Sequence, residues 1–190
     1  MNTRNILISG LIIVLIVIAA TFLLTKGEKK QENKAGNAQV STNMNITSTA
    51  FKQNEPIPSK YTCDGQDLTP PLSFSEVPGG AQSLALSVVD PDSPSGHFTH
   101  WVAWNIPADT KEIPEGSLST GIIQGKNDFG KEEYGGPCPG QGTHRYVFNL
   151  YALDARLDIV KGASRDEQED VMVNHILSHA ELVGVYTRQK

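Results

Sequence analysis

The chain has 190 residues, of which 38% are hydrophobic and 19% are charged, and its formal net charge at pH 7 is −5. This composition is typical of one globular domain with a sizeable core and excludes a disordered protein. The negative balance argues against sequence-independent binding to nucleic acid, because phosphate backbones are bound by basic surfaces.

Residues 6–24 form a separate N-terminal segment. The run contains no charged residue, and only Ser9, Gly10 and Thr21 interrupt its apolar character. A helix of this length spans roughly 28 Å, close to the ~30 Å hydrocarbon core of a bilayer. We expect a transmembrane anchor or signal-anchor here, after a short flank over residues 1–5. A cleaved signal peptide is the alternative.

The next segment, residues 25–45, is polar and almost without large apolar side chains, so it predicts a flexible tether. Its lysines oppose Arg4 across the apolar run, and charge alone therefore leaves the orientation of an anchor open. The globular domain is expected over residues 46–190, which carry a net charge of −8 when His is counted as neutral.

Between residues 46 and 157 the sequence consists of short β-prone runs separated by Gly- and Pro-rich turns. This spacing predicts an antiparallel sandwich or barrel. The connection over residues 107–136 is long enough to be interpreted as a functional loop. One helix is predicted afterwards, because Ser164 and Glu167 have capping-box spacing ahead of apolar residues that continue to Leu177. Residues 182–187 are expected to form a last strand.

A loop rich in charged side chains and prolines begins at Asp90. Residues 83–89 alternate as a strand does, and the sequence DPDSP that follows them contains Asp90 and Asp92. Pro91 and Pro94 restrict the backbone and remove two amide donors, so the carboxylates are expected on a rigid turn at the end of the strand. The alternative is that these residues only make a turn.

Two histidines stand where strands are predicted to begin after Gly- or Pro-rich loops. Because side chains alternate along a strand, each is expected to begin an apolar face. The first face is His100, Val102, Trp104 and Ile106. The second face is His144, Tyr146, Phe148 and Leu150. We expect the two loops to form two walls of one pocket.

The two cysteines, Cys63 and Cys138, lie in separate turns. Two isolated thiols do not predict a metal site. In an oxidising compartment one disulfide would join the two loops, whereas in a cytosol both residues would remain thiols. We favour an extracytoplasmic domain and therefore the disulfide.

His175 and His179 are four residues apart near the end of the predicted helix, a spacing that can bind zinc. No Glu follows the first His as in zinc proteases, and no third ligand lies nearby. We interpret the two residues as a partly exposed pair near the helix C-terminus, where the helix dipole favours cations.

Two segments, DPDSPSGHFTHWVAWNIP and NDFGKEEYGGPCPGQGTHRYVFNLYALD, occur in this order. They resemble the phosphatidylethanolamine-binding protein family, most closely its bacterial and archaeal Raf kinase inhibitor-like (YbhB/YbcL) branch, and the likeness runs from about Ile46 to Thr187. The resemblance implies a large antiparallel β-sheet packed on a smaller one, with few peripheral helices. It also implies a small pocket for phosphate-like anions and phospholipid headgroups. The ligand-binding positions that it carries over are Asp90, Asp92, Pro94, His100, Gly136, Pro137, His144 and Tyr146.

This chain departs from the family's pattern at two of the expected pocket positions. Ser93 stands where Ala is usual, and Gly140 stands where a second Pro often follows. We expect these residues to loosen one wall of the pocket without removing a polar group.

The residue chemistry agrees with an anion site. Candidate hydrogen-bond donors are the rings of His100 and His144, the Tyr146 hydroxyl and the backbone amides of the Gly-Gly turn. Carboxylates would repel a bare anion, so we expect them to orient the His rings or to meet the cationic end of a zwitterion such as ethanolamine. No cofactor or metal is expected.

The alternative function is a hydrolase or a metal-dependent enzyme that uses the Asp/His cluster. The sequence contains no G-x-S-x-G motif, and the cluster lacks the spacing of common metal sites. The resemblance also permits an inhibitor or regulator of a protein partner such as a kinase or protease. We expect a membrane-anchored binding protein that is not an enzyme.

Overall fold

The structure is a computed structural model that describes residues 43–118 and 120–188. The predicted flank and membrane segment, and the tether as far as residue 42, lie outside the described residues. Within the described ranges, no helix is both long enough and apolar enough to cross a membrane. Met44 is already buried in the core of the domain.

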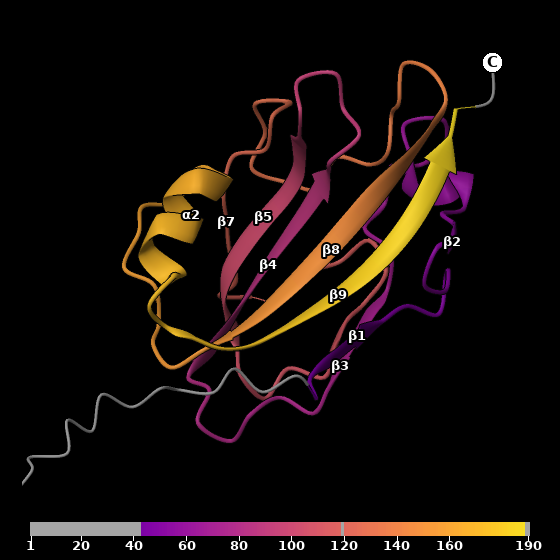
Figure 1. Cartoon of the computed structure of the whole chain (residues 1–190). Coiled ribbons are helices and arrows are strands. Elements are labelled where there is room, and N and C mark those ends of the chain that lie inside the picture. Colours follow the sequence, from indigo (N-terminus) through magenta and orange to yellow (C-terminus); the bar gives the residue numbers. More distant parts are fainter. Residues whose placement is uncertain (1–42, 119, 189–190) are drawn as a thin grey trace, which may run out of the picture. The chain divides into compact units, whose positions relative to one another are not determined.

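The domain consists of two β-sheets (Figure 1). The strands of the large sheet are β2 (Glu55–Pro56), β4 (Ser83–Asp90), β5 (Phe98–Pro107), β7 (Ile123–Gln124), β8 (Thr143–Leu153) and β9 (Ile176–Thr187). Those of the small sheet are β1 (Asn45–Thr47), β3 (Leu72–Ser75) and β6 (Glu112–Ile113). The helices of the described part are the 3₁₀ helix η1 (Ser59–Tyr61) and α2 (Arg165–Met172).

The large sheet has the order β2-β9-β8-β4-β5-β7, and the small sheet has the order β1-β3-β6. All pairs are antiparallel except that of β2 with β9, which is parallel. This arrangement confirms the predicted fold class, a mainly β protein with a large sheet packed on a smaller one.

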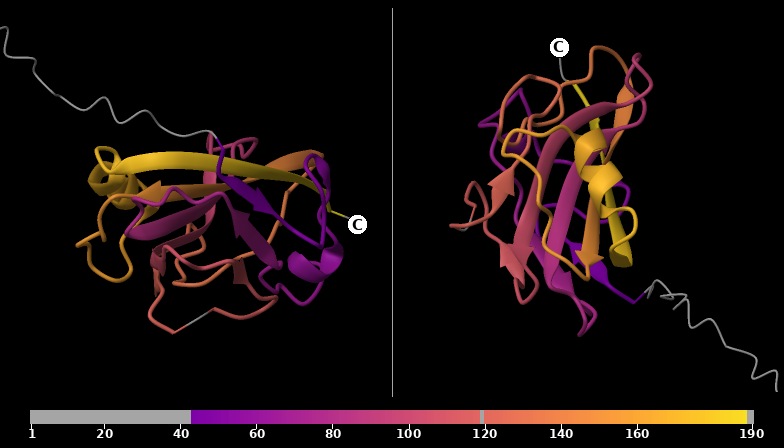
Figure 2. Two further views of the ribbon diagram at one scale, coloured as in Figure 1. Left: turned by 90° about the horizontal axis from the view of Figure 1, so that it is seen from below. Right: turned by 90° about the vertical axis from the view of Figure 1, so that its left-hand side faces the viewer.

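β4 lies at the centre of the large sheet and is buried at every position. Leu84, Leu86 and Val88 belong to the core between the two sheets, so their predicted shared face is confirmed. On the opposite face Met172 of α2 and Trp104 belong to a second core cluster. Figure 2 shows the helix lying over the strands of the large sheet. A strand covered on both faces needs apolar side chains in both directions, which explains why this run is hydrophobic almost throughout.

β5 does not alternate regularly, and one part of the predicted face is therefore wrong. The register between β4 and β5 shifts here, because β5 has one more residue than β4 has over residues 84–86. The shift lies next to Asn105, whose φ is 56°. Such a β-bulge inverts the side-chain alternation beyond it. As a result Ile106 packs between the sheets, whereas Val102 and Trp104 pack on the side of α2.

The helix ends earlier than predicted. α2 stops at Met172, and Ile176 and Leu177 already belong to β9. β9 pairs with β8 along almost its entire length, and this backbone ladder overrides the helical spacing of the apolar residues. The capping box of Ser164 and Glu167 is formed as predicted.

His175 and His179 do not share a helix face, because the chain between them is a strand. His175 lies just before β9, 2.7 Å from a carboxylate oxygen of Asp154. The ring of His179 stacks on Tyr151 of the neighbouring strand, with centroids 4.5 Å apart. The helical spacing expected for a zinc pair is therefore absent, and each residue has a separate local partner.

Cys63 and Cys138 form a disulfide with a Cα–Cα distance of 5.4 Å, in agreement with the predicted pairing. The backbone amide of Cys63 also donates to the carbonyl of Pro137 at 3.2 Å. The bond ties the loop after η1 to the loop before β8, two segments separated by 75 positions in sequence.

Replacing both cysteines by alanine is expected to lower the free energy of unfolding by about 4 kcal/mol, because the cross-link restricts the unfolded chain over a long loop. The urea midpoint of the oxidised protein, compared with that of the double variant, measures the effect. Wild type reduced with a dithiol is the control and should approach the variant. Equal midpoints for all three samples would contradict the prediction.

Candidate functional site

A pocket of about 220 Å³ lies at one end of the large sheet. It is formed where β4 ends and where β5 and β8 begin, an end that is at the top in Figure 1. The sequence-predicted residues among its lining are Asp90, Pro94, His100 and His144. The aromatic rings of Phe98 and Phe129 form much of the remaining lining. The two loops therefore do meet in one pocket.

Asp90 and His144 form a pair at the base of the two loops. His144 Nδ1 lies 2.7 Å from Asp90 Oδ2, and the two side chains are 12% and 6% exposed. His144 Nε2 lies 3.1 Å from the carbonyl oxygen of Gln141. A carbonyl can only accept, so Nε2 directs an N–H at Gln141. The contact with Asp90 fixes the orientation of the ring, which lines the pocket.

His100 enters the pocket because of a second β-bulge in β5. The register with β4 slips between Trp101 and Thr99, so His100 is the extra residue. Its ring then packs against Tyr146 of β8, with centroids 5.1 Å apart, and not beside Val102 as the regular alternation predicted. Bulges often redirect a side chain next to a binding site.

The protonation of His100 follows from its surroundings. Nδ1 lies 2.7 Å from the carbonyl oxygen of Gly135, which can only accept, so Nδ1 carries the proton. Burial lowers the pKa of His100 below its usual value, although the carbonyl of Gly135 and the charge of Asp90 partly offset this effect. The ring is therefore neutral near pH 7, and Nε2 keeps an unshared electron pair.

Asp92 lies on the rim and does not line the pocket. Its carboxylate accepts hydrogen bonds from the backbone and the guanidinium of Arg145, the latter at 2.9 and 2.7 Å. This pairing lowers the pKa of Asp92 to about 2. Its backbone amide donates to Asp90 Oδ1 at 2.8 Å, so the residue also holds the turn. Asp92 is thus a structural neighbour of the pocket.

The Gly-Gly turn precedes residues 138–140, which line the pocket, but neither glycine lines it. The amide of Gly135 donates to the carbonyl of His100 at 2.9 Å, and the amide of Gly136 donates to Asp67 Oδ1 at 2.6 Å. Both amides are therefore used inside the protein, and the expectation that they donate to an anion is wrong for this structure. Pro137, whose carbonyl accepts from the amide of Cys63, does not line the pocket either.

Tyr146 lies behind the pocket. Its side chain is fully buried, and its hydroxyl has no hydrogen-bond partner among the described residues. Burial and the negative charge of Asp90 raise the pKa of Tyr146; the amide of Cys138 lowers it in part, without meeting hydrogen-bond geometry. The hydroxyl is therefore a neutral donor that is left unused.

Two supporting residues were not predicted. Asn127 accepts from the amide of Phe129 at 3.1 Å and donates to the carbonyl of Glu133 at 2.8 Å, so it holds the loop that carries Phe129. An Asn followed by a Gly-containing turn is a recognisable signal for this role. Asp67, the partner of Gly136, has no such signal, because the two residues are 69 positions apart.

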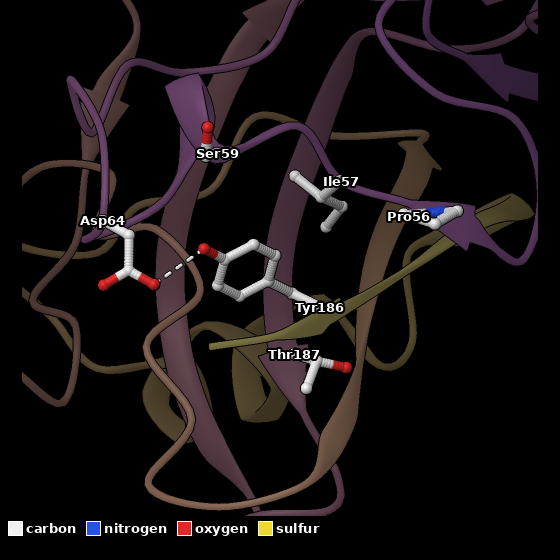
Figure 3. A pocket seen from close by; sticks show the side chains of 6 residues that line it. All are labelled: Pro56, Ile57, Ser59, Asp64, Tyr186 and Thr187. Atoms are coloured by element: carbon white, nitrogen blue, oxygen red, sulfur yellow. Dashed lines mark hydrogen bonds between the residues drawn. The ribbon is translucent and has the colours of Figure 1, made fainter. Parts of the chain in front are cut away.

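A larger hollow of about 630 Å³ lies beside the end of β9 (Figure 3). Asp64 in its lining accepts a hydrogen bond from the Tyr186 hydroxyl at 2.8 Å and pairs with Arg188 at 2.9 Å. Its carboxylate is thus already neutralised by a cation of the same chain. The smaller pocket is the better candidate, because the ring nitrogens of His100 and His144 can form hydrogen bonds with a ligand.

A metal site would require a group of side chains that could bind the ion together. Over residues 43–118 and 120–188, no three His, Cys, Asp or Glu side chains are placed together so that they could hold a metal ion.

The two packed sheets and the end pocket with its Asp and His residues define a class of small β-sandwich binding domain. Residues 47–187 match the family described as phosphatidylethanolamine-binding protein. The chain belongs to this family.

Similar proteins come from archaea and bacteria. A UPF0098 protein of Methanothermobacter thermautotrophicus is 49% identical over 150 residues, which cover 76% of this chain and 99% of the relative. A UPF0098 protein of Pyrococcus horikoshii is 50% identical over 151 residues, covering 75% of this chain and 76% of the relative.

Solved structures share the fold. The phosphatidylethanolamine-binding protein homolog CT736 of Chlamydia trachomatis is 40% identical, with a TM-score of 0.75 over 78% of this chain and 100% of that chain. YbcL of Escherichia coli, described as a member of the mammalian PEBP family, is 31% identical, with a TM-score of 0.72 over 77% of this chain and 99% of that chain.

Gly136→Ala is expected to destabilise the domain by roughly 1 to 3 kcal/mol, since overpacking forces backbone shifts. A Cβ at this position would lie 2.4 Å from the carbonyl oxygen of Tyr61 and 2.5 Å from Asp67 Oδ1. Gly140→Ala is the matched control in the same loop, because nothing lies within 4 Å of its added Cβ. Thermal unfolding of both variants provides the measurement. Equal stability of the two would show that the loop is not close-packed at Gly136.

Proposed function

We propose that the pocket binds a phosphate-bearing small molecule or a phospholipid headgroup and does not change it chemically. The observation that carries this proposal is the position of His144 at the pocket, where Asp90 fixes its ring and Nε2 faces the carbonyl of Gln141, an acceptor. A phosphate oxygen can take the place of the Gln141 carbonyl at this donor. A hydrogen bond from this N–H to an ionised phosphate oxygen is of the strong, charge-assisted kind.

The size and lining of the pocket favour a small ligand. A volume of about 220 Å³ lies below the usual range for drug-sized ligands, so a headgroup fits while acyl chains would remain outside. The carboxylates of Asp90 and Asp92 are already paired with His144 and Arg145. The ring faces of Phe98 and Phe129 are therefore the better position for the ammonium of ethanolamine.

Binding without turnover is supported by what surrounds His144. A general base needs an unshared electron pair, but His144 Nδ1 lies against Asp90 Oδ2 and Nε2 directs its N–H at the carbonyl of Gln141. The hydroxyl of Ser93, which also lines the pocket, bonds instead to the hydroxyl of Ser95 at 3.0 Å. Neither arrangement is that of an activated nucleophile.

His144→Ala is expected to weaken binding of phosphoethanolamine by one to two orders of magnitude, because a hydrogen bond to a charged group contributes ~1.5 to 3 kcal/mol. Calorimetric titration measures the affinity, and a phosphate-release assay on the same mixture is expected to show no hydrolysis. His175→Ala is the matched control, since this exposed His lies outside the pocket and also pairs with an Asp. Unchanged affinity in His144→Ala, or release of phosphate, would refute the proposal.

We further propose that residues 6–24 anchor the protein, with the domain on the extracytoplasmic side, where it could act on a protein partner such as a kinase or protease. The uncharged run of membrane-spanning length supports the anchor, and the disulfide supports an oxidising compartment.

The full chain is therefore expected to sediment with membranes and to retain its first residues, whereas a chain starting at residue 43 should remain in the supernatant. Fractionation combined with mass spectrometry of the N-terminus gives the measurement. A mature terminus between Ala20 and Asn37 would contradict the anchor.

A further inference from the structure

We infer that His100 makes the pocket selective for ligands that bring their own hydrogen-bond donor, and specifically for a phosphate monoester in its singly protonated form over the sulfate ester of the same shape. This inference rests on the proposed function and defines the ligand class of the same site. It follows from the hydrogen bond that fixes the orientation of the His100 ring.

Most of the donors that the sequence predicted are engaged or buried. Both Gly-Gly amides donate within the protein, and the Arg145 guanidinium is held by Asp92. The N–H at His144 Nε2 faces the Gln141 carbonyl, which a ligand must displace, and the Tyr146 hydroxyl is buried.

His100 adds an acceptor to the pocket. Its Nδ1 proton is bound by the carbonyl of Gly135 at 2.7 Å, so the nitrogen left for a ligand is Nε2 with its unshared electron pair. The bulge that places His100 in β5 and the packing of its ring against Phe98, Phe129 and Tyr146 hold this orientation. An unprotonated phosphate oxygen near Nε2 would be repelled, because both atoms carry unshared electron pairs and no proton lies between them. A P–OH group would instead donate a hydrogen bond to Nε2.

Four titratable groups surround His100 on the elements packed against it. They are Asp90 from β4, His144 and Tyr146 from β8, and Asp128 from the loop after β7. The two carboxylates favour a charged His100, but burial is the largest effect and favours the neutral ring. His100 Nε2 therefore remains an acceptor at neutral pH. We expect the pH dependence of binding to be set by the protonation of the phosphate monoester.

The test compares phosphoethanolamine with 2-aminoethyl sulfate, which has the same shape and no acidic hydrogen in this pH range. The second pKa of a phosphate monoester is about 6, so about half of it is singly protonated at pH 6 and about one part in a hundred at pH 8. Calorimetry at pH 6 is expected to show phosphoethanolamine binding roughly tenfold more tightly than the sulfate, the value of one good hydrogen bond. Its affinity should fall at least tenfold by pH 8, while that of the sulfate changes little.

His100→Asn is the informative variant. Its amide can still donate to Gly135, but nothing remains at the position of Nε2. The preference for phosphate over sulfate is expected to fall to within about twofold. Imidazole ¹⁵N NMR of the wild type is an independent check that needs no variant, and it should show Nδ1 protonated and Nε2 unprotonated at pH 7.

The outcomes separate this inference from the proposed function. Equal binding of the two esters by the wild type, tighter phosphate binding at pH 8, or a proton on Nε2 would overturn the inference while leaving phosphate-ester binding in place. If neither ester bound at either pH, the proposed function would fail, and the inference would fail with it.

Discussion

The pair of Asp90 and His144 is the interaction on which the pocket depends. It joins the end of β4 to the start of β8 at a distance of 2.7 Å, with both side chains nearly withdrawn from water. Burying such a pair costs desolvation free energy that the mutual attraction offsets only partly, and apolar residues of similar size would stabilise the sheet at least as well. Its position at the pocket therefore argues for a role in ligand chemistry, with stability as a secondary effect.

Two further irregularities of the fold lie at the same end of the sheet. The bulge at His100 turns one ring out of the regular alternation of β5, and the turn after Asp90 is closed by the backbone of Asp92. The opposite wall is held from behind by Asp67 and by the disulfide. A regular sandwich would direct these groups to separate faces, so the departures from regularity are what assemble the site.

Part of this structure could be predicted from the local sequence pattern alone. Alternation predicted the face of Leu84, Leu86 and Val88, because β4 pairs with β8 without a bulge along these residues. It also predicted the alignment of His144 with Phe148, because the pairing of β8 with β9 shifts only beyond Ala152. The two His-bearing loops and the disulfide were likewise predicted from residue type and spacing.

What could not be predicted depends on pairing between distant segments. The bulges of β5 arise from its register with β4, and the end of α2 is set by the ladder between β8 and β9. The bonds from Asp67 to the amide of Gly136 and from Arg145 to Asp92 join residues 69 and 53 positions apart. No short stretch of sequence contains that information, and these contacts decide which donors remain free for a ligand.

The position of β9 has a consequence for how the protein is made. This strand, the last one described, lies inside the large sheet between β2 and β8, and β2 belongs to the first part of the domain. On the ribosome, neither neighbour can complete its pairing until residues as far as Thr187 have been synthesised. Pairings between such distant segments form slowly, so during synthesis the apolar edge of β8 remains open to chaperones or to other nascent chains.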